Sequence, residues 1–188
     1  MLATVSKRSS LIVPAVVFLL GAGAASAQTR AFVAGGAVLP LGDFAAVAEP
    51  GAAIAAGVLL DVGSRGLAVG VEASYGRARH SIGDARSDVY GLTGLVAYTL
   101  GGLGPVELAP TLGVGALVHA RRSGDLPGLD ATRAGAGATL GLRATVAVGG
   151  ARAFAAGSYI LGFGNVNAAA FPTEFSSVTV GVTVPLGG

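Results

Sequence analysis

A histidine and a serine stand side by side at His80 and Ser81, and two aspartates follow at Asp84 and Asp88. A histidine can activate a serine hydroxyl and a carboxylate can orient the histidine, so these residue types could form a hydrolytic triad. Adjacent residues of a strand point to opposite faces, however, and a triad needs side chains that converge on one point. The pattern therefore favours a solvated polar loop, and we predict no catalytic residues.

Metal and cofactor chemistry is poorly supported. His119 has no second histidine nearby, cysteine is absent, and no glycine-rich phosphate loop opens a helix. Acidic residues in or beside the expected loops could gather divalent cations, although solvation alone explains them. They are Asp43, Glu49, Asp84, Asp88, Asp125 and Asp130. We expect no metal site and no cofactor.

The segment from Pro105 to Arg122 alternates strictly between two kinds of residue. One side of the alternation is apolar and carries no charge, whereas the other is small or polar and includes Glu107, His119 and Arg121. Alternation with a period of two is typical of a strand, because successive side chains point to opposite faces. A strand this long with one uncharged apolar face suits the wall of a membrane barrel, with lipid outside and a packed polar lumen inside.

The N-terminus has the marks of a secretory signal peptide. Lys7 and Arg8 precede an apolar run over residues 11–20, and the run ends at small residues before Ala27. This run is too short to be a spanning helix. We predict cleavage between Ala27 and Gln28, which leaves residues 28–188 as an outer-membrane β-barrel domain.

Composition points the same way. Beyond the leader, ten arginines balance ten acids without a basic patch, so the sequence argues against nucleic acid as a partner. Charged residues make up 12% of the sequence, about half of what a soluble domain carries, and the mean hydropathy is +0.71. No segment after the leader reaches 18 uninterrupted apolar residues, and a closed barrel is the remaining way to span a bilayer.

Eight segments read as strands. They are residues 30–39, 52–62, 67–77, 88–100, 105–122, 132–148, 152–163 and 174–186. Long connections follow the first, third, fifth and seventh strands, and short ones follow the others, which is the asymmetry of outer-membrane barrels. The predicted fold class is therefore all-β, an eight-stranded antiparallel up-and-down transmembrane β-barrel.

The chain resembles the small eight-stranded outer-membrane β-barrel family, which includes OmpA-like and OmpX-like domains. The segment AFVAGGAVLPLGDFAAVAEPGAAIAAGVLLDV carries the likeness, above all its turn from Pro40 to Phe44 and the later Gly51. The resemblance covers residues 28–188 by strand pattern. Two features depart from the family: this sequence ends VPLGG where members usually end in an aromatic residue, and it has no tryptophan.

Charges on the inward face predict a salt-bridged plug, since an eight-stranded lumen is just wide enough to be filled by side chains and a buried charge needs a partner. The predicted lumen charge cluster is Glu72, Glu107, Arg143 and Arg133, with Asp61 and Arg152 as further candidates. By parity we expect Glu107 and Arg143 to pair across neighbouring strands. Aromatics near the strand ends predict two thin interfacial girdles. These are Phe32, Tyr75, Tyr90, Tyr98, Tyr159 and Phe163.

We expect a non-enzymatic monomer in the cell outer membrane, with a structural, anchoring or adhesive role through its external loops. Its expected partners are outer-membrane lipid and, at the loops, lipopolysaccharide or extracellular ligands of a host. A soluble lipocalin-like barrel that binds an apolar ligand is the main alternative, although its exterior would then carry very few charges. A lipid A-modifying enzyme ranks lower, because the lipid A deacylases separate their histidine and serine by one residue and follow them with asparagine.

Overall fold

The computed structural model describes residues 28–63, 66–81, 84–124, 130–163 and 174–186. Eight long strands account for most of them: β1 (Thr29–Pro40), β2 (Gly51–Val62), β3 (Leu67–Arg79), β4 (Ala85–Tyr98), β6 (Val106–Ser123), β7 (Ala131–Val148), β8 (Ala151–Phe163) and β9 (Glu174–Leu186). A two-residue strand β5 (Gly102–Leu103) and one helical turn α2 (Gly42–Ala45) lie between them. No helix within these ranges is long and apolar enough to cross a membrane. All eight predicted strands are present.

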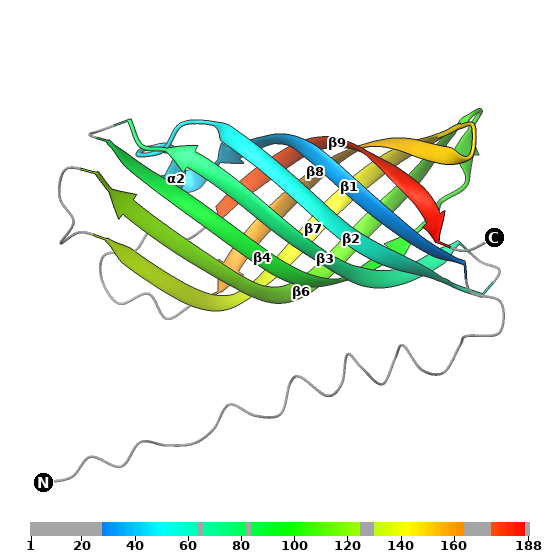
Figure 1. Cartoon of the computed structure of the whole chain (residues 1–188), viewed down its shortest axis with the longest axis horizontal. Helices are drawn as coiled ribbons and strands as arrows, with labels where there is room; N and C mark the ends of the chain where they lie inside the picture. The colour runs from blue at the N-terminus through cyan, green and yellow to red at the C-terminus, as the bar shows by residue number, and fades with distance from the viewer. Residues whose placement is uncertain (1–27, 64–65, 82–83, 125–129, 164–173, 187–188) are drawn as a thin grey trace, which may run out of the picture.

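The strands close into a barrel (Figure 1). Each long strand pairs antiparallel with the next, β4 pairs with β6 beside the short β5, and β1 pairs with β9 along its whole length. Closure leaves no long edge strand with unpaired backbone groups, which is what a spanning sheet requires. The predicted fold class, an eight-stranded antiparallel up-and-down barrel of the transmembrane type, is confirmed.

The two ends of the barrel differ in their connections. At one end, called here the turn end, β2 joins β3, β4 joins β6 and β7 joins β8 through short turns. Gly66 (φ 73°) and Gly149 (φ 58°) take the left-handed conformation that these tight turns need. At the opposite end, called the loop end, the longer connections gather and α2 lies within the barrel mouth (Figure 1).

The apolar face of each strand points outward, as predicted. Val114 is 71% exposed, Val180 65% and Leu92 63%, and Leu112, Leu140 and Val178 are all more than half exposed. These side chains form an uncharged outer band that only lipid would solvate favourably, since a soluble surface is normally rich in charge.

The lumen is filled, but its filling is less polar than the sequence analysis predicted. One apolar cluster lies toward the turn end: Phe32, Ala34, Leu59, Ala68, Leu95 and Phe154. A second lies toward the loop end: Val38, Phe44, Ala48, Ala53, Ala78, Val89, Leu117, Ile160 and Phe175. Because glycine and alanine alternate with these large residues along the inward faces, the rings have room inside a narrow barrel.

Candidate functional site in the barrel lumen

Ion pairs occupy the turn end of the lumen. Arg30 of β1 pairs with Asp61 of β2, and Arg152 of β8 pairs with Glu107 of β6. The expected pair between Glu107 and Arg143 is wrong, because the β6–β7 register sets Glu107 opposite Thr145 and Arg143 opposite Ala109. The long Arg152 side chain reaches Glu107 past the intervening strand β7 instead.

Arg143 lies between two aromatic rings. Its guanidinium carbon is 4.2 Å from the ring centroid of Phe154 and 4.6 Å from that of Phe32. The two rings meet edge to face, with centroids 6.1 Å apart. A guanidinium over aromatic faces is held by cation–π attraction, which strengthens where water is excluded. We call Arg143, Phe32 and Phe154 the arginine plug.

Glycine makes space for the arginine plug. A Cβ atom built on Gly57 of β2 would lie 2.6 Å from Cζ of Phe32, and one built on Gly181 of β9 would lie 2.7 Å from Cζ of Phe154. Both separations are far below van der Waals contact, so neither position accepts a larger side chain while the rings stay in place.

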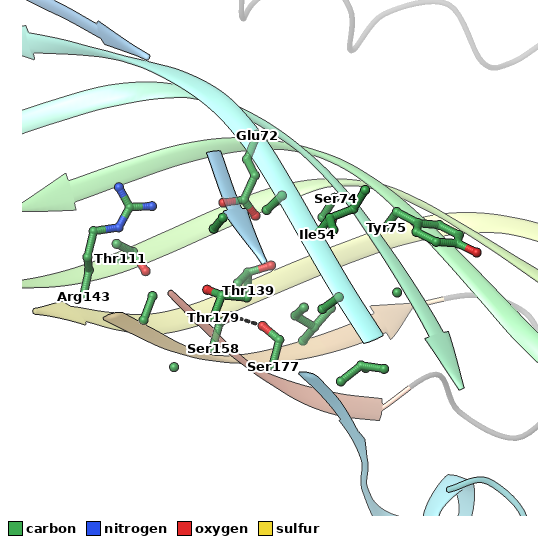
Figure 2. A pocket seen from close by; sticks show the side chains of 18 of the residues that line it. Ile54, Glu72, Ser74, Tyr75, Thr111, Thr139, Arg143, Ser158, Ser177 and Thr179 are labelled. Atoms are coloured by element: carbon green, nitrogen blue, oxygen red, sulfur yellow. Dashed lines mark hydrogen bonds between the residues drawn. The ribbon is translucent and has the colours of Figure 1, made fainter. Parts of the chain in front are cut away.

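A small cavity with a mixed apolar and polar lining lies on the loop-end side of the arginine plug (Figure 2). Its volume is about 60 Å³, which is room for a few water molecules. Glu72 and Arg143 both project into it and interact electrostatically, and Ser158 and Ser177 share a hydrogen bond of 2.7 Å across its wall. A second cavity, of about 30 Å³, lies toward the turn end, and Arg143 lines both cavities. The arginine plug therefore separates two internal spaces.

Phe44 closes the loop end. It comes from α2, which folds into the barrel mouth, and its side chain is only 2% exposed. The turn expected from Pro40 to Phe44 is present, and α2 forms its second half. Phe44 packs edge to face against two histidines, with centroid separations of 6.3 Å to His80 and 5.7 Å to His119.

The two histidines bind one serine beneath Phe44. Nε2 of His80 is 2.9 Å from the hydroxyl oxygen of Ser87, and Nε2 of His119 is 2.8 Å from the same atom. Ser87 is 1% exposed. Burial, reinforced by the positive charge of Arg121, lowers the pKa of His80 below its ordinary value. His80 is therefore neutral at neutral pH, and Ser87 lies out of reach of a bulky substrate.

The triad suggested by the sequence is not assembled. The hydroxyl of Ser81 donates to the backbone carbonyl of Val47 at 3.4 Å. Asp88 points away from the lumen, where it accepts hydrogen bonds from Tyr75 at 2.6 Å and Arg77 at 2.7 Å. Among the residues that the structure describes, no group of three His, Cys, Asp or Glu side chains could hold a metal ion.

The four predicted lumen charges do not form one cluster. Glu72, Glu107 and Arg143 line the two internal cavities, and so does the further candidate Arg152. Asp61 lines neither cavity, but its partner Arg30 lines the one at the turn end. Arg133 lies exposed at the loop end, in register with His119. It is ten residues from Arg143 on the same strand, a separation of about 33 Å. Arg133 therefore takes no part in the plug.

The predicted girdle residues differ in where the structure places them. Phe32 is wrong as a girdle residue, because it is 4% exposed and points into the lumen. Tyr90 and Tyr98 are exposed on the outer face, at 48% and 46%. Tyr75 stacks on Tyr90 with ring centroids 5.1 Å apart, and the hydroxyl of Tyr159 donates to Glu174. The side chain of Phe163 lies outside the described residues.

The serine that both histidines bind was not predicted from the sequence. The predicted polar loop ends at residue 87, whereas β4 begins at Ala85 and pairs with β3 as far as Arg79. With the strand extended, Ser87 has the inward parity of Val89 and Thr93, and His80 and His119 share that face. Phe154 was also not predicted to face inward. It lies two residues from the inward Arg152 on the same strand, and this even spacing could have identified it.

Comparison with known proteins bears on the fold. No family model matches the sequence, and no curated protein matches it. Among solved structures, Neisserial surface protein A is 17% identical, with a TM-score of 0.58 over 85% of this chain and 97% of that one. A major outer membrane protein of Thermus thermophilus is 14% identical, with a TM-score of 0.60 over 86% of this chain and 100% of that one.

The N-terminal β-barrel domain of Pseudomonas aeruginosa OprF is also similar. It is 11% identical, with a TM-score of 0.52 over 86% of this chain and 100% of that domain. Identities this low establish shared architecture and no shared chemistry. Three independent barrels are nevertheless covered almost end to end. The chain therefore has the fold of the small eight-stranded outer-membrane barrels, as its sequence resemblance predicted.

Proposed function

We propose that the protein is a non-enzymatic outer-membrane barrel that acts as an anchor, with its loop-end surface making structural or adhesive contacts. One observation carries this proposal: the lumen is closed at two levels, by the arginine plug and by Phe44. A barrel that conducts solutes needs a continuous aqueous path, and eight strands leave no spare width once side chains fill the interior. The side chains of the interior then stabilise the barrel, and any contacts with other molecules are made by its outer surfaces.

Export and placement complete the proposal. We propose that residues 1–27 are a signal peptide cleaved between Ala27 and Gln28, although residues 1–27 lie outside the described residues. Residues 28–188 then form one barrel domain in the outer membrane. Because a closed barrel offers no free edge for strand pairing, we expect a monomer. Contacts with lipopolysaccharide or with extracellular ligands would involve the loop end.

Both alternatives meet a physical objection. A lipocalin-like barrel would turn its apolar face inward around a ligand, whereas Val114 and Val180 point outward and the larger internal cavity is about 60 Å³. Drug-sized ligands occupy pockets of roughly 300 Å³ or more. A lipid A-modifying enzyme needs an accessible nucleophile, and Ser87 is 1% exposed.

Conductance in planar bilayers tests the proposal. We expect the purified wild-type protein to show no steady conductance. The double variant Phe32→Ala and Phe154→Ala removes both rings of the arginine plug, and Phe44→Ala removes the loop-end closure. Combining the three changes should produce measurable leak if these side chains are the seal. A stable open channel in the wild type would refute the proposal. Cell fractionation with heat-modifiability on a gel tests the outer-membrane location separately.

A further inference from the structure

Three arginines form a row across the outer face at the loop end. Arg79 of β3 is in register with Arg86 of β4, and Arg86 is in register with Arg122 of β6. Each lies an even number of residues from an exposed outer-band residue of its own strand, namely Val71, Tyr90 and Leu112. Even spacing in a strand means the same face. The three guanidinium groups therefore emerge side by side from the surface that faces lipid farther down the barrel.

The row lies just beyond an aromatic pair. Tyr75 and Tyr90 stack on the same two strands with ring centroids 5.1 Å apart. Arg79 follows Tyr75 by four residues, or about 13 Å along the strand. Tyrosines on a barrel exterior mark the level of the lipid headgroups. The arginine row then lies at and just above the level where headgroup phosphates are found.

Internal ion pairs leave the row incompletely neutralised. The buried Asp88 is bound closely by Arg77, with Nε 2.7 Å from the carboxylate, while Arg86 lies farther from it at 3.4 Å. Arg122 is 3.5 Å from Asp130, and both side chains are substantially exposed, so the pair is weak. Arg79 has no ion pair with any residue in the described ranges.

The arginines share one open groove of about 770 Å³. Its charged lining is Arg77, Arg79, Arg86 and Arg122, with Glu49 and Asp84 as the acids. Like charges that stand directly opposite on neighbouring strands destabilise a sheet, so an anion between them would relieve repulsion. Guanidinium groups also match phosphate geometry, since each can donate two parallel hydrogen bonds.

We propose that this groove binds a phosphate group of an anionic lipid in the outer leaflet, with Arg79, Arg86 and Arg122 as its ligands. A lipid fits better than a free anion because the arginine row shares its outer strand faces with the tyrosine pair and the apolar outer band, along which acyl chains would lie. This inference rests on the proposed placement of the barrel in a bilayer with its loops outside. Arg77, which is held by its ion pair with Asp88, would form the fixed floor of the site.

The test uses lipid A as the phosphorylated probe. Native mass spectrometry of the folded protein in detergent micelles measures the bound fraction against lipid A and against lipid A without phosphates. We expect Arg79→Gln, Arg86→Gln and Arg122→Gln together to weaken lipid A binding about tenfold or more, because three charge-assisted contacts are lost. Binding of the dephosphorylated lipid should be weak and equal in both proteins. Arg133→Gln, an exposed loop-end arginine outside the groove, should change nothing.

A single variant and a competition experiment complete the test. If the triple variant does not fold, Arg79→Gln alone should still lower lipid A affinity severalfold, because Arg79 has no ion pair within the described part of the chain whose loss would destabilise the fold. Equal binding of lipid A by the wild type and a folded variant would overturn the proposal. So would displacement of lipid A by equimolar inorganic phosphate, which would mark a site for free phosphate. Since binding is measured in micelles, its failure is separate from a failure of the conductance or fractionation tests.

Discussion

The two halves of the lumen are closed by different chemistry. The turn-end half is closed by full charges: Arg30 with Asp61, Arg152 with Glu107, and Arg143 facing Glu72 beneath two phenyl rings. The loop-end half is closed by Phe44, whose ring covers two histidines and the hydroxyl of Ser87. The ordinary pKa values of arginines and carboxylates lie outside the physiological pH range, whereas that of histidine lies close to it.

The turn-end closure should therefore hold at any pH near neutrality, whereas the loop-end closure should depend on pH. Removing one partner from a buried ion pair is costly at any neutral pH, because the other charge remains without compensation. A histidine cluster is stable only while its imidazoles stay neutral under the apolar cover. The turn-end half should therefore respond mainly to substitution, and the loop-end half to acid as well.

The largest effect should come from Arg143→Ala. The change leaves the Glu72 carboxyl inside the barrel without its cation and removes the guanidinium from between the rings of Phe32 and Phe154. We expect the free energy of unfolding to fall by about 3 to 5 kcal/mol. Urea titration in lipid vesicles, with the folded fraction read from gel mobility, measures it. Arg133→Ala, which lies exposed at the loop end, is the matched control and should cost less than about 1 kcal/mol.

A second variant tests the cause of that loss. Adding Glu72→Gln to Arg143→Met replaces both charges by neutral groups of similar size, which is often nearly neutral for stability. The double variant should recover most of what Arg143→Ala loses. If it is no more stable than Arg143→Ala, the uncompensated carboxylate is not the source of the effect.

A smaller loss should follow from filling the space beneath the plug. In Gly57→Ala the new Cβ would lie 2.3 Å from the carbonyl oxygen of Val71 and 2.6 Å from Cζ of Phe32. Overpacking of this kind costs about 1 to 3 kcal/mol. Gly94→Ala is the control, because its Cβ would meet nothing closer than 3.7 Å. Equal urea midpoints for the two variants would mean that both the ring of Phe32 and the backbone at Val71 move aside without cost.

The barrel itself was predictable from the sequence, because strand alternation and connection length are local signals. The alternation between Val106 and Ser123 marks both the length of β6 and the side of it that faces out. An aromatic residue near a strand end is a weaker indication of an interfacial girdle. Phe32 lies two residues from the inward Arg30, so strand alternation places its ring in the lumen although it is close to the strand end.

The interior contacts were less predictable, because a long side chain in a narrow lumen can contact residues of strands that are not its neighbours in the sheet. Arg152 meets Glu107 although their strands are not neighbours in the sheet. Phe44 belongs to a turn, and a turn has no periodic pattern from which its position inside the barrel could be predicted. Ser87 depended on where β4 begins, and strand ends are the least certain feature of any sequence pattern.

The smallest and most specific effect is the acid response of the loop-end half. Burial and Arg121 lower the pKa of His80 in the folded protein, so the unfolded chain binds a proton at higher pH than the folded one. Above about pH 6.5 both states are neutral at this residue and stability is complete. As the pH falls below that value the unfolded state gains its proton first, and the free energy of unfolding decreases.

His80→Gln separates this response from acid effects elsewhere. Glutamine can still donate to Ser87 but does not titrate, and His119 and Arg121 are present in both proteins. We expect urea midpoints measured near pH 7.5 and near pH 5.5 to differ less in His80→Gln than in the wild type. The variant Ser81→Ala, which alters the adjacent exposed hydroxyl, should keep the full wild-type difference. An identical pH dependence in the wild type and His80→Gln would show that His80 does not contribute to the acid response of the loop-end half.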